Sequence, residues 1–163
     1  MAFLKKYQKT FYYLCSFLLP VAILAFILLT QNIYWNSPTT ILASDGFHQY
    51  VIFAQNLRNI LHGQDSLFYT FTSGLGLNFY ALISYYLGSF LSPFVYFFNL
   101  ETMPDAIYLF TLIKVGLMGL SSYYMLTKLY TKLHRALALA LSLSYSLMSF
   151  AMSQIEINMW LDV

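Results

Sequence analysis

Charged residues are scarce in this chain. Asp, Glu, Lys and Arg make up 9% of its 163 residues, whereas about a quarter of a typical soluble domain is charged. Because Cys15 is the single cysteine, an internal disulfide is excluded, and cysteine usage gives no information about the redox compartment. The net charge of +2 gives no reason to expect a nucleic-acid partner. Because 60% of the residues are hydrophobic, the composition predicts an all-α integral membrane protein in contact with the lipid bilayer.

The first membrane span is predicted at residues 11–30. This run holds no charge and is about as long as a helix that crosses a bilayer core of about 30 Å. Lys5, Lys6 and Lys9 precede it, which predicts a cytoplasmic N-terminus. A cleaved signal peptide is the alternative, but no small-residue cleavage site follows the run directly, and the run is longer than usual for such a peptide.

Two further spans are predicted at residues 106–127 and 136–153. The segment 128–135 between them carries Lys128, Lys132, His134 and Arg135, so we expect it in the cytoplasm. The Ser- and Ala-rich last span has the small residues that allow close packing of membrane helices.

The basic cluster at 128–135 bears on whether residues 79–98, which are uncharged and resemble a span, cross the membrane. One crossing there would place the cluster outside, so we expect a re-entrant or interfacial segment instead. Residues 31–105 then form one large outer loop. With this topology all six acids lie outside and six of the eight bases inside, with Arg58 outside and Lys114 within a span.

An amphipathic helix is predicted at about 45–62, lying along the membrane surface. Its apolar residues recur at steps of three and four, and Asp45 stands at its start, where a carboxylate can cap the helix and suit its dipole. Asp45, His48 and Gln49 form one polar group at this position, and Glu156 and Asp162 form another beyond the last span.

These outer acids are candidate catalytic residues. A carboxylate near the membrane surface can act as a general base, and two carboxylates could hold a divalent cation that neutralises a phosphate leaving group; the metal itself cannot be identified. The alternatives are helix capping for Asp45, a polar interfacial role for His48, and solvated loop acids for Glu156 and Asp162.

Two cations are candidate binding residues. Lys114 lies inside a span, where a charge is costly and often functional, although snorkelling or pairing within the bundle would also explain it. Arg58, on the polar side of the amphipathic helix, could meet a lipid phosphate or face solvent and headgroups.

Several segments resemble the amino-terminal region of the bacterial YfhO-like membrane proteins. They are SDGFHQY, LFYTFTSGLGLNFYALISYYLGSFLSPF, LIKVGLMGLSSYYML and INMWLDV, and the similarity runs from about residue 11 to the end. The resemblance implies a multi-span helical bundle that is the first module of a GT-C glycosyltransferase fold, with a large outer loop carrying interfacial helices. It also implies a location in the bacterial cell membrane, and transfer of sugar from a polyprenyl-phosphate carrier to an envelope polymer such as teichoic acid.

By this resemblance, the family's acidic position corresponds to Asp45, with Gln49 and Tyr50 in its motif, and a second outer element corresponds to Glu156–Asp162. Because the family's members are several times longer, we expect a fragment or truncated gene. Such a chain would be inactive alone and would need the missing C-terminal part or another membrane subunit. The rival hypotheses are a non-enzymatic subunit or lipid-transport component, and an inactive remnant.

Overall fold

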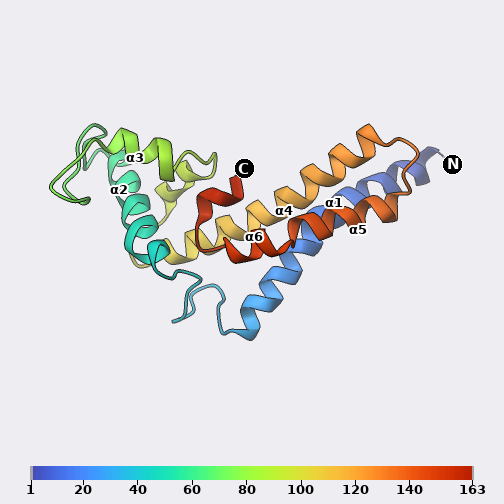
Figure 1. Ribbon diagram of the computed structural model, residues 1–163, viewed down its shortest axis with the longest axis horizontal. Coiled ribbons are helices and arrows are strands. Elements are labelled where there is room, and N and C mark those ends of the chain that lie inside the picture. Colours follow the sequence, from blue (N-terminus) through green and yellow to red (C-terminus); the bar gives the residue numbers. More distant parts are fainter. Residues whose placement is uncertain (1, 163) are drawn as a thin grey trace. The chain divides into compact units, whose positions relative to one another are not determined.

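The computed structural model describes residues 2–162, with side chains from residue 7 onward, and is built from helices (Figure 1). Over this range the only β-type pairing is an isolated bridge between Thr70 and Leu77. Three helical stretches are long and apolar enough to cross a membrane, namely Tyr7–Thr30, Met103–Leu129 and Arg135–Ser153. The predicted class, an all-α membrane protein, is therefore confirmed.

The helical elements follow one another along the chain with few long connections. In order they are α1 (Ala2–Thr30), the π-helical turn η1 (Gly46–Tyr50), α2 (Val51–Leu61), α3 (Phe79–Tyr86), the 3₁₀ helix η2 (Ser92–Phe97), α4 (Met103–Leu129), α5 (Arg135–Ser146), α6 (Ser149–Ser153) and the 3₁₀ helix η3 (Asn158–Asp162).

The chain forms two compact units. Unit 1 comprises Met1–Asn32 and Thr111–Ser153, and unit 2 comprises Ile33–Phe110 and Gln154–Val163. Their charges differ completely in the sequence: unit 1 contains seven Lys and Arg and no Asp or Glu, whereas unit 2 contains all six acids and a single base, Arg58. The units defined by contacts thus also separate the charges of the protein.

Small residues allow the helices of unit 1 to pack closely. Ser16 on α1 and Ser146 on α5 are fully buried. A Cβ atom added to Gly119 of α4 would collide with the backbone carbonyl of Ser16 and lie 3.5 Å from Oγ of Ser146. Because lipid tails are as apolar as side chains, membrane helices depend on such close contact for their association. Glycine and serine therefore fix the spacing of the three helices.

The last predicted span is interrupted. Instead of one helix over 136–153, the structure has α5 and α6, with a break at Leu147 and Met148. Ser142, Ser144 and Ser146 each donate a side-chain hydrogen bond to a carbonyl three or four residues earlier. Such bonds compete with the helical pattern and bend helices, which accounts for a break directly after Ser146.

Unit 2 is organised around α2, which packs against η2 and α3. Its buried face is mainly apolar and includes Phe53, Ala54 and Leu57, with Asn56 as a buried polar residue. Arg58 donates a hydrogen bond from Nε to the carbonyl of Phe98, just beyond η2. One turn later the ring of His62 stacks on that of Tyr96, with centroids 4.2 Å apart. These contacts hold the carboxyl end of α2 against η2.

The segment 79–98 contains two short helices. In α3 the Asn78 side chain caps the start by accepting a hydrogen bond from the Tyr80 amide, and the helix ends at Tyr86. Eight residues rise only about 12 Å, far less than the roughly 30 Å of a bilayer core. Pro93 then stands in the first turn of η2. The position of this segment along the membrane surface remains a prediction.

Candidate functional site

The candidate site is built on the tight turn that leads into α2. Ser44 has a positive φ of 46°, and its carbonyl accepts hydrogen bonds from the amides of Phe47 and His48. The chain then forms the π-helical turn η1, a widened turn that is often found at functional sites. Asp45 is thereby placed at the exposed start of the helix.

The Asp45 carboxylate does not cap this helix. Its backbone is already helical, and its side chain makes no capping hydrogen bond among the described residues. Instead, Oδ1 accepts a hydrogen bond of 3.1 Å from Nε2 of Gln49, one turn later. The capping interpretation of Asp45 is therefore wrong, because the π-helical turn carries the carboxylate toward Gln49 rather than back to the amides. This contact orients the carboxylate and leaves it exposed to solvent.

Tyr50 lies beneath this exposed pair. It is only 3% exposed, and its hydroxyl oxygen has no hydrogen-bond partner of good geometry within the described residues. Burial raises the pKa of the phenol to about 12; the nearby Met159 backbone opposes the shift, while Tyr86, Tyr85 and Asp45 add smaller increases. The ring of Tyr86 meets the Tyr50 ring edge-on at 5.5 Å. Tyr50 is thus a neutral, buried group that supports the turn.

The C-terminal acidic segment lies beside this turn, within the same unit. A Cβ atom added to Gly46 would lie 3.2 Å from the Glu156 carbonyl oxygen, so the two backbones approach closely. Further along, the Met159 backbone lies close enough to the Tyr50 hydroxyl to influence its pKa. Ser89, between α3 and η2, donates a hydrogen bond of 3.1 Å from Oγ to Oδ1 of Asp162. Three segments distant in sequence therefore meet around η1.

The acidic and imidazole side chains of this region remain accessible. His48 and Asp162 are exposed, and Glu156 is half-buried. The His48 ring packs edge-on against that of Phe47, with centroids 5.6 Å apart. The described residues contain no group of three or more His, Cys, Asp or Glu side chains that could hold a metal ion.

The other two predicted binding residues are placed differently. The Arg58 guanidinium bonds to the Phe98 carbonyl, and its Nη1 lies 3.5 Å from Oδ1 of Asn59, so at least part of it serves to hold α2 in place. Lys114 is buried in α4 and belongs to unit 1, whereas Asp45 belongs to unit 2.

Three residues of this region were not predicted from the sequence. Gly46 follows Asp45 directly, and a glycine beside a candidate carboxylate could have signalled a close backbone approach. Ser89 and Tyr86 belong to the segment 79–98, for which the sequence predicts a position at the membrane and no contact with the candidate site. No local pattern connects them with Asp45 or Asp162, because hydrogen bonds between distant segments leave no periodic signal.

These features define a polytopic helical membrane protein with an acidic, partly exposed site in its second unit. Residues 16–163 match the family model described as "Bacterial membrane protein YfhO". The chain belongs to this family, and the resemblance inferred from its motifs is confirmed. No curated protein and no solved structure matches the chain significantly.

Proposed function

We propose that the chain is the first module of a membrane glycosyltransferase of the GT-C type. In this proposal it takes part in the transfer of sugar from a polyprenyl-phosphate carrier to an envelope polymer such as teichoic acid, on the outer face of the cell membrane. The observation that carries the proposal is the meeting of the Asp45 turn with the Glu156–Asp162 segment inside one unit.

Asp45 is assigned the role of general base. An exposed carboxylate oriented by Gln49 can accept the proton of an acceptor hydroxyl while that oxygen attacks the anomeric carbon of the sugar. The bond from that carbon to the carrier's phosphate oxygen breaks, and the phosphate leaves with the electron pair. Tyr50, buried and neutral, would keep the turn rigid beneath the carboxylate.

The remaining site residues have supporting roles in this proposal. His48 is exposed beside Asp45 and can donate a hydrogen bond to a phosphate oxygen or a sugar hydroxyl. Glu156 and Asp162 would complete the acidic surface that faces the acceptor. Arg58 and Lys114 are the weaker candidates for substrate contact, since Arg58 already bonds to Phe98 and Lys114 belongs to the other unit.

The test is Asp45→Asn, made in the native gene of a bacterium whose teichoic acid carries sugar. The substitution keeps the size of the side chain and removes its charge and basicity. The rate of sugar transfer, followed by the sugar content of the purified teichoic acid over time, should fall on the order of 10²-fold or more, the usual size of a general-base contribution. Protein level in the membrane should stay unchanged.

Asp65→Asn is the matched control. Asp65 is another exposed carboxylate of the same loop, and it accepts a hydrogen bond only from the adjacent Ser66 amide among the described residues. It should leave transfer unaffected. Near-normal transfer with Asp45→Asn, combined with normal protein level, would show that the carboxylate is not the base.

A further inference from the structure

Unit 1 contains a polar hollow that the proposed glycosyl transfer does not use. The hollow has a volume of about 300 Å³. Each of three helical segments contributes one base to its wall: Lys9 comes from α1, Lys128 from α4 and Arg135 from α5. Hydroxyl groups complete the wall, among them those of Tyr13 and Thr127, whose oxygens are 3.4 Å apart. The hollow therefore presents cationic and neutral hydrogen-bond donors.

The bases have no carboxylate partner within unit 1, because that part of the sequence contains no Asp or Glu. Aromatic rings hold two of them instead. The Lys9 ammonium lies 5.9 Å from the ring centroid of Tyr13, and the Lys128 ammonium lies 5.5 Å from that of Tyr124. Such contacts orient an ammonium group without neutralising it. Three positive charges around one small hollow repel one another, so an anion bound there would stabilise the arrangement.

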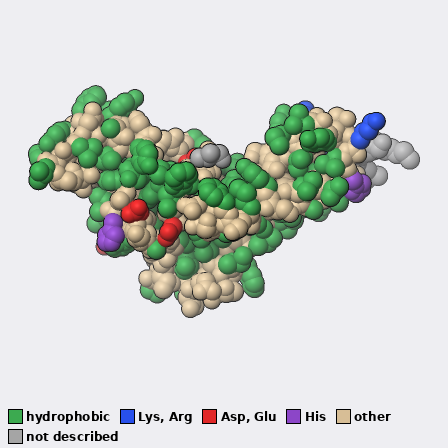
Figure 2. Space-filling model, viewed as in Figure 1, with side chains coloured by type: hydrophobic (Ala, Val, Ile, Leu, Met, Phe, Trp, Pro, Cys, Tyr) green, Lys and Arg blue, Asp and Glu red, His purple; other side chains and the backbone are tan. Residues whose placement is uncertain are grey.

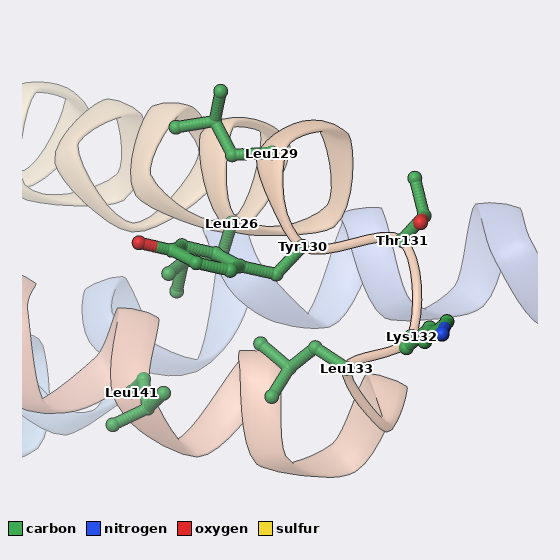
Figure 3. A pocket seen from close by; sticks show the side chains of 7 residues that line it. All are labelled: Leu126, Leu129, Tyr130, Thr131, Lys132, Leu133 and Leu141. Carbon is green, nitrogen blue, oxygen red and sulfur yellow. The ribbon is translucent and has the colours of Figure 1, made fainter.

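An apolar groove adjoins the hollow. It has a volume of about 750 Å³, and its lining includes Leu126 and Leu129 of α4 and Leu141 of α5 (Figure 3). The Tyr130 ring lies between the two helices in this view, and both Tyr130 and Leu133 line the hollow as well as the groove. The polar and apolar sites are thus continuous around the turn between α4 and α5.

The position of the hollow matches the level of lipid headgroups. Lys9 stands in the first turn of one membrane-spanning stretch, Lys128 in the last turn of another, and Arg135 at the first residue of the third. In Figure 2 the visible Lys and Arg side chains gather over the end of α4 and the turn that follows it. Charged heads that leave a bilayer core at this level meet the phosphates of the adjacent leaflet.

We infer that this composite site binds one anionic phospholipid of the adjacent leaflet. Its phosphate lies in the hollow among Lys9, Lys128 and Arg135, and one of its acyl chains lies along the leucine groove. Inorganic phosphate would satisfy the bases and leave the groove unused, whereas a lipid matches both the charge and the apolar surface. The site is confined to unit 1 and does not depend on the assignment of Asp45.

The experiment uses the full chain, purified in a mild neutral detergent and titrated with phosphatidylglycerol, with bound lipid counted by native mass spectrometry. Replacing two bases, in Lys128→Gln/Arg135→Gln, should weaken binding of one phosphatidylglycerol at least tenfold. Lys132→Gln is the matched control. Lys132 lines the groove but not the polar hollow, so this variant removes a charge from the same turn and leaves the three bases of the hollow in place. Its affinity should stay within twofold of the parent.

A second pair of measurements separates a lipid from a free anion. Leu141→Gln should weaken binding of long-chain phosphatidylglycerol and leave binding of its dihexanoyl form nearly unchanged. The melting temperature of each variant, measured without lipid and compared with that of the parent protein, identifies a misfolded variant. If the double variant misfolds, Leu141→Gln alone tests the inference. Equal affinity for phosphatidylcholine, or complete displacement of the lipid by an equal concentration of inorganic phosphate, would overturn the inference.

Discussion

The Ser89 hydroxyl donates a hydrogen bond to Oδ1 of Asp162, which lies 73 positions later in the chain. The bond connects the break after α3 with the last residue of η3. It is one of the contacts that hold the C-terminal segment in unit 2, beside the Asp45 turn.

Removing this bond should loosen the C-terminal segment. A single hydrogen bond of this kind contributes about 1 kcal/mol. In Ser89→Ala we therefore expect the amides of residues 158–162 to exchange with solvent several-fold faster, while those of α2 are unchanged. Hydrogen exchange followed by mass spectrometry makes the comparison, and Ser84→Ala, which removes a hydroxyl bonded only within α3 among the described contacts, is the control. Equal rates of amide exchange at residues 158–162 in both variants would contradict the inference that Ser89 holds the C-terminal segment in place.

Tyr50 should make the protein sensitive to alkali. Since burial raises the pKa of its phenol from 10.0 to about 12, the folded state holds this proton more tightly than the unfolded chain. The resulting stability is complete below pH 10 and is lost as the pH rises through 12, a change of about 2–3 kcal/mol in the free energy of unfolding. Denaturant titrations at several pH values should show this loss.

In Tyr50→Phe this part of the pH dependence should vanish. The substitution also removes a buried hydroxyl without a good hydrogen bond, so stability at neutral pH should stay equal or rise slightly. Tyr80→Phe, at a side chain that is 57% exposed, should retain the alkaline loss. A marked loss of stability at neutral pH in Tyr50→Phe would mean that the hydroxyl is well bonded in the protein.

Close packing in unit 1 should make Gly119 intolerant of any side chain. Its added Cβ would meet the Ser16 carbonyl, a backbone atom that cannot rotate away. We expect Gly119→Ala to lower the stability of the detergent-solubilised protein by about 1–3 kcal/mol, as overpacking usually does. Gly88→Ala is the control, because its nearest neighbour would be at an ordinary 3.5 Å. Equal melting temperatures of the two variants would exclude a tight contact at Gly119.

The predicted topology can be tested by chemical labelling. In a Cys15→Ser background, single cysteines at positions 65 and 101 should both react with a membrane-impermeant reagent added to intact cells. Both positions belong to the predicted outer loop, on either side of the two short helices. Labelling at 65 together with protection at 101 would show that the segment 79–98 crosses the membrane.

The class of the protein could be predicted from sequence, because long uncharged runs and clustered lysines are strong signals that each depend on one stretch of chain. The Asp45 turn could be predicted only as a polar group at the start of a helix. The positive φ of Ser44 and the close approach of Gly46 to the Glu156 carbonyl accompany this turn, and neither leaves a periodic signal in the sequence. The break after Ser146 also escaped prediction, since hydropathy averages over residues 136–153 do not register serine hydroxyls that bond to the helix backbone.

The lack of carboxylates in unit 1 bears on how the protein responds to acid. Acid unfolding of proteins comes mainly from the protonation of carboxylates that are paired in the native state. Unit 1 has none to protonate, and His134 is its only imidazole. All six carboxylates belong to unit 2, including Asp105, which accepts a hydrogen bond from the Asn36 amide. The packing of the unit 1 helices therefore includes no carboxylate whose protonation could weaken it.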